Sequence, residues 1–483
     1  MEKKDTKYLA PSPADLETAA AILRQGGTVI FPTETVYGLG ANALSADAVK
    51  KIFAAKGRPA DNPLIVHIAD VTELSKLTAD ISPAAQKLID AFWPGPLTLI
   101  FKKSPQIPSA VTGGLNTVAI RMPSSEIARK LLQITKLPIA APSANLSGKP
   151  SPTSFRYVKA DMDGRVDAII NGGDCTVGVE SAVLDVSGET PILFRPGKVT
   201  REQIENLIGP IKTVSHVQEG EAPKSPGLKY KHYAPNAKVL ILHGSLEQVQ
   251  DYINHQKNLR VGMLVFDEFP PLYRIAAKRS LGSRSKPQEA AHRLFTALRE
   301  LDDEKVDVIL APEIPDFGIF SAVRNRLYRA AGGVILDLTK QNQKILFVCT
   351  GNTCRSPMAE GLLRSQNSTF SVSSAGLFAD GSPVSDHAVS ALAELGIDIS
   401  GHRSRQLTPA MAEEADLILT MTNAHRKMLE TTIPQAASKT LTLSQWAGET
   451  GDVSDPFGGS QEDYNICRDQ ILTLIQKGLS LHP

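Results

Sequence analysis

Short apolar runs alternate with helical patterns through the first 210 residues. The segments 14–24 and 84–91 carry apolar side chains at helical spacing, whereas the runs between such segments are too short for helices. This alternation is typical of an α/β domain. The predicted strands are Thr28–Phe31, Leu64–Ile68, Leu97–Phe101, Thr117–Ile120, Ala168–Ile170 and Ala182–Val186.

The rest of the chain contains a linker and two further blocks. Polar and turn residues without periodicity predict a linker over 211–236. Residues 237–340 repeat strand, helix and strand, which predicts a small parallel-sheet domain. Residues 341–483 open on a buried-type strand, Ile345–Val348, with a helix expected from about Pro357. We therefore predict α/β domains over 1–210, 237–340 and 341–483.

Composition agrees with this division and narrows the class of protein. A chain of 483 residues suggests about three domains at roughly 100–200 residues each. Its 52 basic and 51 acidic residues are balanced, so any RNA contact would have to be a local patch. Four cysteines do not make a disulfide framework, and neither a signal peptide nor a membrane span is evident. We expect a cytoplasmic protein without a membrane partner.

The most specific motif is Cys349-x5-Arg355, at the end of the strand that opens the third block. Gly351 and Asn352 tolerate left-handed backbone, and a helix follows, so the loop can direct backbone N–H groups at a phosphate. The same field favours the thiolate of Cys349 as a nucleophile, and Arg355 offers a planar fork for phosphoryl oxygens. We expect the remaining loop residues to bind phosphate: Thr350, Gly351, Asn352, Thr353, Cys354 and Ser356.

Two residues have alternative interpretations. Asp455, before Pro456 and far along the chain from the motif, is either an ordinary turn residue or the general acid for the leaving group; the presence of the cysteine loop favours the acid. Cys354 is either a buried small residue or the partner of Cys349 in a disulfide formed under oxidation.

Residues 344–483 resemble a low-molecular-weight protein tyrosine phosphatase. The resemblance implies that Cys349 is the nucleophile, Arg355 binds phosphate and Asp455 is the acid. Thr353 and the Asp455–Gly459 run resemble the bacterial protein-arginine phosphatases, so phosphoarginine in a phosphoprotein is the first expected substrate and phosphotyrosine the second. The matching motifs are Val348–Glu360, Ser374–Gly376, Gly401–Gln406, Ala415–Met421 and Asp455-Pro456.

The first block places cations among turn residues in several separate loops. For any single loop a solvated surface is the favoured interpretation, but five such loops in one domain favour an anionic ligand with several phosphates. They are Lys56–Pro59, Arg121–Pro123 and Arg195–Gly197, with hydroxyl and amide groups in Pro142–Gly148 and Glu180-Ser181. The run Gly38–Ala43 resembles a dinucleotide fingerprint only weakly, because the stretch before it contains proline and polar residues.

Residues 8–210 resemble the YrdC/Sua5 family, which makes threonylcarbamoyl-adenylate, and 237–335 resemble the C-terminal domain of its longer members. The resemblance implies a YrdC-like twisted open sheet, a small Rossmann-like second domain, and a third domain with a central parallel sheet. The matching motifs are Phe31–Gly40, Lys56–Pro59 with Asn62–Leu64, Phe92–Thr98, Arg121–Pro123, Pro142–Asn145 through Thr153, and Phe194–Gly197.

The implied reaction joins L-threonine, bicarbonate and ATP, with Mg²⁺ assisting and no metal held by the protein alone. We assign Lys56, Arg58 and Arg195 to phosphates and carboxylates, and Thr33 and Arg121 to threonine. Ser143, Asn145 and Ser181 would orient the nucleotide, and Tyr230 and His232 would close over the site as a lid or order a connector. The product would pass to the tRNA threonylcarbamoyl transferase complex for t6A modification of tRNA.

Two other hypotheses stay open at this stage. The first block would be a double-stranded RNA-binding module rather than a synthase, in which case RNA affinity would depend on salt. The third block would be a phospho-binding relic, although intact Cys349, Arg355 and Asp455 disfavour that interpretation.

Overall fold

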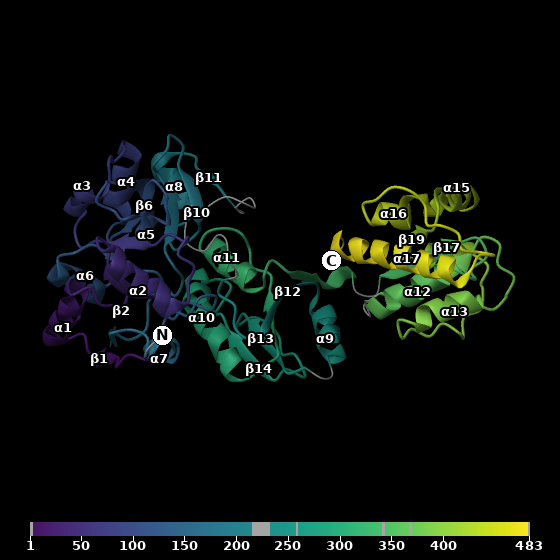
Figure 1. Ribbon diagram of the computed structural model, residues 1–483, viewed down its shortest axis with the longest axis horizontal. Helices are drawn as coiled ribbons and strands as arrows, with labels where there is room; N and C mark the ends of the chain where they lie inside the picture. The colour runs from purple at the N-terminus through teal and green to yellow at the C-terminus, as the bar shows by residue number, and fades with distance from the viewer. Residues whose placement is uncertain (1–2, 215–231, 257–258, 341–342, 367–369, 482–483) are drawn as a thin grey trace. The chain divides into compact units, whose positions relative to one another are not determined.

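The computed structural model describes residues 3–214, 232–256, 259–340, 343–366 and 370–481. The chain forms two compact units, which we describe separately (Figure 1). The first unit comprises residues 1–243 and 249–336, and the second comprises 244–248 and 337–483. None of the described helices combines the length and apolar character needed to cross a bilayer.

The first unit contains an 11-stranded sheet. Its strands are β1 (Lys7–Leu9), β2 (Val29–Pro32), β3 (Tyr37–Asn42), β4 (Ile65–His67), β5 (Leu97–Lys102), β6 (Thr117–Arg121), β7 (Ile139–Ala140), β8 (Ala168–Ile170), β9 (Ala182–Asp185), β10 (Ile192–Arg195) and β11 (Lys212–Thr213). They lie in the order β1-β8-β2-β3-β7-β4-β6-β5-β9-β10-β11, with parallel and antiparallel pairs mixed.

Helices cover both faces of this sheet because neighbouring strand residues point to opposite sides. Val29 and Phe31 pack with α1 and α6, whereas Ile30 packs into the larger core beneath α2 and α4. The helices are α1 (Pro13–Arg24), α2 (Ala46–Lys56), α3 (Leu74–Leu77), α4 (Pro83–Phe92), α5 (Ser109–Thr112), α6 (Glu126–Thr135), α7 (Phe155–Met162) and α8 (Arg201–Ile208), with a short 3₁₀ turn η1 (Val71–Glu73).

A second sheet completes the first unit. Its strands are β12 (Lys238–His243), β13 (Val261–Val265), β14 (Ala277–Ser280), β15 (Val308–Pro312) and β16 (Ile335–Asp337), and its helices are α9 (Leu246–His255), α10 (Pro287–Asp303) and α11 (Phe320–Ala330). The strand order is β14-β13-β15-β12-β16, and the pairs of β13 with β14 and of β15 with β12 and β13 are parallel.

The two sheets of the first unit share a hydrophobic core. Val36, Val177 and Val179 of the first sheet's loops pack into the core that α10 and α11 form with the second sheet. A Cβ atom on Gly178 would lie 2.3 Å from the backbone of His292 in α10, so the two parts meet at backbone distance. This shared core explains why they form one compact unit.

The second unit is a four-stranded parallel sheet between two layers of helices. The strands are β17 (Lys344–Cys349), β18 (Ser371–Gly376), β19 (Leu417–Thr420) and β20 (Thr440–Thr442), in the order β18-β17-β19-β20. Ile345 and Phe347 face one core, and Leu346 and Val348 face the other. The helices are α12 (Arg355–Gln366), α13 (Asp386–Ala393), α14 (Pro409–Glu414), α15 (Asn423–Thr432), α16 (Leu443–Trp446) and α17 (Gln461–Leu481), with 3₁₀ turns η2 (Leu338–Lys340) and η3 (Pro434–Lys439).

The predicted mixed α/β architecture is confirmed, and most boundaries agree within one or two residues. The run Gly38–Ala43 lies mostly in β3, an antiparallel partner of β2, and is therefore not a phosphate-binding turn between a strand and a helix. Residues Lys212–Thr213 of the expected linker pair with β10 as the last strand of the first sheet. Residues 215–231 of the linker lie outside the described part of the chain.

Candidate functional site

A polar cavity opens in the first unit where the ends of several strands meet. It encloses about 740 Å³, including its open mouth. The turn between β2 and β3, the end of α2, and the ends of β4, β6 and β10 all contribute to its wall. The residues of interest that line it are Thr33, Lys56, Arg58, His67, Arg121, Ser143, Asn145, Glu180, Ser181, Arg195, His232 and Tyr233.

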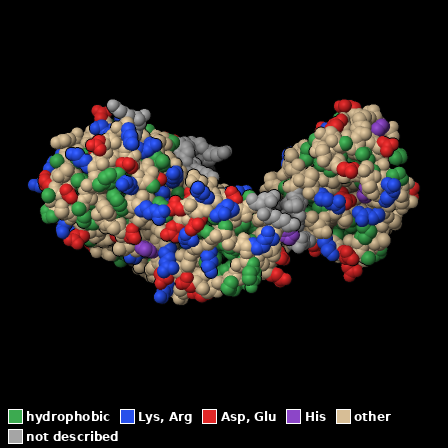
Figure 2. Space-filling model, turned by 90° about the horizontal axis from the view of Figure 1, so that it is seen from below, with side chains coloured by type: hydrophobic (Ala, Val, Ile, Leu, Met, Phe, Trp, Pro, Cys, Tyr) green, Lys and Arg blue, Asp and Glu red, His purple; other side chains and the backbone are tan. Residues whose placement is uncertain are grey.

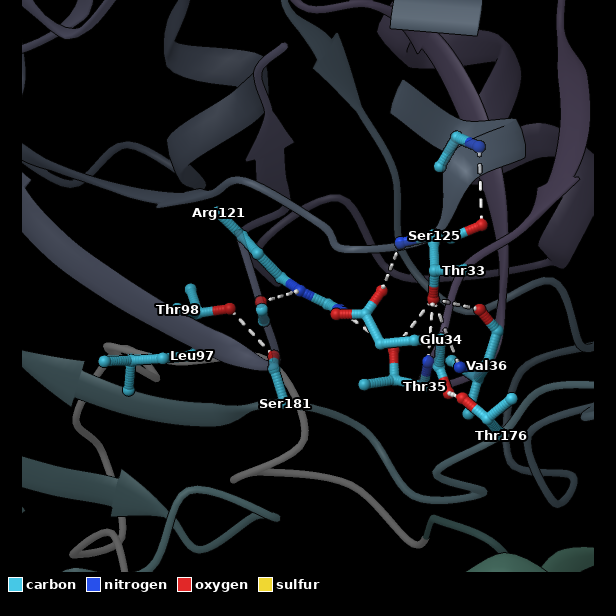
Figure 3. Close-up of polar contacts among 12 residues, drawn as sticks. Thr33, Glu34, Thr35, Val36, Leu97, Thr98, Arg121, Ser125, Thr176 and Ser181 are labelled. Carbon is cyan, nitrogen blue, oxygen red and sulfur yellow. Dashed lines mark hydrogen bonds and ion pairs between the residues drawn. The ribbon is translucent and has the colours of Figure 1, made fainter. Parts of the chain in front are cut away.

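One wall contains a buried ion pair, which Figure 3 shows with its neighbours. Arg121 Nη2 lies 2.5 Å from Glu34 Oε1, and both side chains are less than a tenth exposed. Arg121 also donates to the Thr35 hydroxyl and to the Gly95 carbonyl. Burial alone would raise the pKa of Glu34, but Arg121 holds it below its usual value. The ionised pair therefore fixes the β2–β3 turn against the end of β6.

Thr33 shapes the same turn. Its hydroxyl donates to the Val36 carbonyl at 2.6 Å and accepts from the backbone N–H groups of Thr35 and Val36. These contacts hold the backbone of the turn at the cavity wall (Figure 3).

Lys56 ends α2 and is buried among carbonyl oxygens. Its ammonium donates to the backbone carbonyls of Ser143 and Asn145 at 2.5 and 2.6 Å, and Asn145 Oδ1 lies 3.4 Å away. Burial, and then the neighbouring Arg58, hold the pKa of Lys56 well below its usual value. In this arrangement Lys56 supports the loop that presents Ser143 and Asn145.

Arg195 and Ser181 form a second polar group on the wall. Arg195 donates through Nε to the Ser181 carbonyl at 3.0 Å and through Nη2 to its hydroxyl at 3.3 Å. The Ser181 hydroxyl also contacts that of Thr98 at 2.8 Å (Figure 3). The hydroxyl of Tyr233 hydrogen bonds with Arg195. These hydrogen bonds hold the Arg195 guanidinium against the Ser181 segment at the cavity wall.

Two buried nitrogens at the cavity have no hydrogen-bond partner among the residues that the structure describes. They are Arg58 Nε and His232 Nε2. Burial lowers the pKa of Arg58 to about 10, and burial followed by Arg58 lowers the pKa of His232 to about 3. A buried polar atom without a partner is costly, so a polar ligand that reached these nitrogens would gain their hydrogen-bonding capacity.

One further cation, from a helix on the second sheet, contacts the cavity wall from behind. Arg326 of α11 donates through Nε to Glu180 Oε2 at 3.0 Å and through Nη2 to the Glu180 carbonyl at 3.1 Å. Glu180 lines the cavity and is itself buried. Sequence reasoning assigned no role to Arg326, and an isolated arginine on a helix in another domain gives no local signal.

The cavity fits a metal–nucleotide complex better than a metal held by the protein. Mg²⁺ is usually bound by one or two carboxylates together with substrate phosphates and water. Glu180 is the one carboxylate among the described residues lining the cavity, and both its oxygens accept hydrogen bonds, from Ser151 and Arg326. No group of three or more described His, Cys, Asp or Glu residues could hold a metal ion.

The second unit carries its candidate site on one loop between β17 and α12. Cys349 Sγ accepts a hydrogen bond from the Asn352 N–H at 3.2 Å and lies 3.0 Å from Ser356 Oγ. Gly376 of β18 lies beneath the loop, where a Cβ atom would be 2.7 Å from the Thr350 carbonyl. The strand end, the helix start and the neighbouring glycine together place a buried cysteine at the base of a tight loop.

Asn352 organises this loop. It has φ of +56°, the left-handed conformation expected there, whereas Gly351 does not adopt a positive φ. Its side chain donates to the hydroxyls of Ser356 and Ser374 at 2.9 and 2.8 Å and accepts from the Arg405 N–H. The loop conformation is therefore fixed by buried hydrogen bonds.

Arg355 and Asp455 meet at the mouth of this loop. Arg355 Nη2 lies 2.6 Å from Asp455 Oδ2; the arginine side chain is buried and the aspartate side chain is half exposed. His425 contacts the Thr350 hydroxyl at 2.8 Å, and burial followed by Arg355 lowers the pKa of His425 to about 4. Sequence reasoning missed His425, which lies in another helix. The structure thus brings Asp455 to the cysteine loop, although it lies 100 positions after Arg355 in the chain.

All four cysteines are free and buried. Cys354 Sγ contacts the Tyr464 hydroxyl at 3.1 Å, and burial raises the pKa of that tyrosine to about 12. Of the predicted site residues, all those in the first unit except Tyr230 line one cavity, and all those in the second unit lie on the loop or at its mouth. Tyr230 lies outside the described residues.

Family models match three consecutive parts of the chain. The Sua5–YciO–YrdC model, described as telomere recombination, matches residues 21–197. The model for the C-terminal domain of threonylcarbamoyl-AMP synthase matches 199–332, and the model of low-molecular-weight phosphotyrosine protein phosphatase matches 344–480.

Known proteins that are similar to this chain match either its first two parts or its third part. The threonylcarbamoyl-AMP synthase of Bacillus subtilis is 50% identical over 339 residues, which is 68% of this chain and 97% of that protein. A protein-arginine-phosphatase of Geobacillus stearothermophilus is 48% identical over 137 residues, which is 28% of this chain and 92% of that protein. A solved structure of Pyrococcus abyssi Sua5 complexed with L-threonine is 44% identical, with a TM-score of 0.65, and covers 69% of this chain and 99% of its own.

Proposed function

Because the chain belongs to the threonylcarbamoyl-AMP synthase family of Sua5 type and carries a low-molecular-weight phosphatase domain, we propose that it is a bifunctional enzyme with two separate chemistries. The first is synthesis of L-threonylcarbamoyl-adenylate from L-threonine, bicarbonate and ATP. The second is hydrolysis of phosphoarginine in proteins, with phosphotyrosine as the weaker substrate. The observation that carries the synthase proposal is the meeting of Lys56, Arg58, Arg121 and Arg195 in one cavity.

In the synthase, positioning and charge neutralisation would do most of the work. The threonine amine and bicarbonate first form N-carboxy-threonine with loss of one water. Its carbamate oxygen then attacks the α-phosphorus of ATP, and pyrophosphate leaves with the electron pair of the broken P–O bond. Lys56, Arg58 and Arg195 would bind phosphate and carboxylate oxygens, and Mg²⁺ would arrive with the nucleotide. The unpartnered Nε of Arg58 supports this assignment.

The remaining cavity residues would orient the two substrates. Ser143, Asn145 and Ser181 present hydroxyl and amide groups to the cavity, which suits the nucleotide. Thr33 and Arg121 would hold threonine, and the relative crystallised with L-threonine supports a threonine subsite in this family. His232 would close over the bound ligand, since its buried Nε2 is unpartnered.

The synthase proposal is tested by the dependence of pyrophosphate release on each substrate. Purified protein should release pyrophosphate only when ATP, L-threonine and bicarbonate are all present, and the adenylate should be consumed when a tRNA threonylcarbamoyl transferase complex and tRNA are added. The alternative, a double-stranded RNA-binding module, predicts salt-sensitive RNA affinity without pyrophosphate release. On the face of the first unit drawn in Figure 2, basic and acidic side chains are interspersed, which gives that alternative no support.

In the phosphatase, the Cys349 thiolate would attack phosphorus to form phosphocysteine. Arg355 and the loop from Thr350 to Ser356 would bind the phosphoryl oxygens, and Asp455 would protonate the leaving nitrogen or oxygen. Water, deprotonated by Asp455, would then release phosphate and restore the thiolate. Binding of phosphate to Arg355 would compete with its ion pair to Asp455 and so free the acid.

Phosphoarginine is favoured because Thr353 matches the loop residue of the bacterial protein-arginine phosphatases, where eukaryotic relatives tend to carry a bulkier aliphatic residue. The similarity to a protein-arginine-phosphatase supports this choice. We expect Thr353→Ile to lower kcat/KM for phosphoarginine by about tenfold or more while leaving phosphotyrosine hydrolysis within about threefold. The measurement compares both substrates on the wild type and the variant; a wild type that cleaves phosphotyrosine far faster than phosphoarginine would overturn the ranking.

A further inference from the structure

The side chain of Arg326 is fully buried between two segments of the synthase cavity. Its exposed fraction is 0%, although it comes from α11, which packs on the second sheet. Its guanidinium donates to the carboxylate and the carbonyl of Glu180 and to the carbonyl of Pro196. These two residues directly precede Ser181 and follow Arg195 in the sequence, so one side chain holds both segments that form this part of the wall.

Arg326 compensates the buried negative charge of Glu180. The carboxylate lines the same cavity as Lys56, Arg58 and Arg195 and is 6% exposed. Burial would raise its pKa, but Arg326, followed by Arg195, holds the pKa below its usual value, so Glu180 is ionised. Without Arg326, this negative charge would pair with the cavity cations or repel a polyphosphate.

The geometry around Arg326 also depends on close backbone packing. A Cβ atom on Gly197 would lie 2.2 Å from the backbone nitrogen of Ala182, so the turn after Arg195 rests directly on the segment after Ser181. Arg195 in turn donates to the Ser181 carbonyl. Arg326 donates hydrogen bonds to Glu180, just before Ser181, and to Pro196, just after Arg195. It thereby helps to fix the position of Arg195 at the cavity.

We infer that Arg326 is a positioning residue for the synthase: it neutralises Glu180 and locks the two wall segments, so that the cavity cations are available to the phosphates of ATP. The second sheet and its helices are then an integral part of the ATP site. This inference rests on the proposed synthase function, and it concerns the affinity for ATP more than the chemical step.

The test uses the full-length protein and four variants. Arg326→Met removes the charge and keeps the length of the side chain, and Arg326→Lys keeps the charge but lacks the planar fork. Arg326→Met combined with Glu180→Gln removes both charges. Arg299→Met is the control, because Arg299 is a similarly buried arginine of α10 that pairs with Asp161 and the Pro150 carbonyl, neither of which lines the cavity.

We expect Arg326→Met to raise the KM and the Kd for ATP by about tenfold or more, with a smaller fall in kcat. Arg326→Lys should fall between it and the wild type, and the double variant should recover most of the lost ATP affinity. Arg299→Met should lose stability but keep the KM for ATP within about twofold. ATP affinity is measured by calorimetry as well as by turnover, and folding by thermal unfolding.

Two results would overturn the inference. One is an ATP affinity of Arg326→Met equal to that of the wild type; the other is a double variant no better than Arg326→Met, which would show that the unpaired charge of Glu180 is not the cause. If Arg326→Met does not fold, the comparison of Arg326→Lys with Arg326→Lys/Glu180→Gln decides the same point. A wild type that binds ATP without forming adenylate would contradict the proposed reaction and leave the Arg326 comparison intact.

Discussion

The two candidate sites of this protein are built in opposite ways. In the second unit, one loop between β17 and α12 carries the proposed nucleophile Cys349, the proposed phosphate-binding Arg355 and the backbone N–H groups between them. In the first unit, the cavity draws side chains from positions 33 to 233 and depends on Arg326 from another helix layer. The first kind of site is a local conformation, and the second exists only when the whole unit is folded.

The two sites also use cation–carboxylate pairs differently. Arg121 and Glu34 form a buried pair inside the wall of the synthase cavity, whereas Asp455, the partner of Arg355, is half exposed. Loss of one member of the fully buried pair leaves an uncompensated charge. Asp455, in contrast, reaches solvent, so water can take its place beside the buried Arg355 at a lower cost. The Arg121–Glu34 pair therefore maintains the structure of the cavity wall. In the other pair, Arg355 could exchange Asp455 for the phosphate of a substrate.

The largest predicted effect is the complete loss of one activity, with the other activity retained, in each of two variants. Cys349→Ser should lower phosphatase activity by about 10⁴-fold or more because the nucleophile is removed, with adenylate synthesis unchanged. Lys56→Ala should abolish ATP-dependent adenylate synthesis, with phosphatase activity unchanged. Both activities are measured on each purified variant.

Lys56 supports two backbone carbonyls, so the unfolding of Lys56→Ala must be followed alongside its activity. Near-normal synthase activity in a folded Lys56→Ala variant would contradict the assignment. Loss of both activities in either variant would show that the sites are coupled, and the comparison drawn above would fail.

A second experiment compares the two carboxylates. Glu34→Gln should lower the free energy of unfolding of the first unit by about 3 kcal/mol, because it leaves buried Arg121 without a counter-ion. Asp455→Asn should change that of the second unit by less than about 1 kcal/mol and lower kcat for phosphate esters with poor leaving groups by about 10²-fold.

The two tryptophans allow each unit to be followed separately. Trp93 lies in the core of the first unit and Trp446 in that of the second, so Trp446→Phe and Trp93→Phe backgrounds each report on one unit by fluorescence during urea unfolding. A substrate with a good leaving group serves as the control for Asp455→Asn, because its hydrolysis needs little protonation. Equal losses for both leaving groups would contradict the role of Asp455 as the acid.

The last prediction concerns acidification. Burial, and then Arg121, lower the pKa of His67 to about 3 in the folded first unit, compared with about 6.5 in an unfolded chain. On acidification the unfolded chain therefore takes up a proton first, so the stabilising contribution is complete above pH 6.5 and is lost between pH 6.5 and about 3. The slope is at most about 1.4 kcal/mol per pH unit.

His67→Gln provides the matched comparison, since glutamine does not titrate. The difference in unfolding free energy between wild type and variant should shrink as the pH falls from 6.5 to 4, as measured through Trp93. In the second unit, where the pKa of His425 is about 4, the corresponding loss should level off near pH 4. A difference for His67 that is independent of pH would contradict a buried neutral histidine.

Sequence alone predicted the α/β architecture and the contiguous loop of one candidate site, but not the contacts of His425 and Asp455 with that loop. The apolar run of β17 ends at Cys349, and a loop with a left-handed Asn352 leads directly into α12, so strand, loop and helix were readable from consecutive residues. The scattered motifs of the first block also identified side chains that line one cavity, because each motif carried charged or hydroxyl groups at a turn.

Only the tertiary structure decided which groups are paired within that cavity. It showed that the Lys56 ammonium is held by carbonyls, that Arg121 is bound to Glu34, and that Glu180 is neutralised by Arg326. Such pairings depend on how distant helices pack, and the strength of a charge interaction depends on burial, which no local pattern encodes. The sequence therefore predicted which charged and hydroxyl side chains line the cavity, and tertiary packing determined which of them remain available to a ligand.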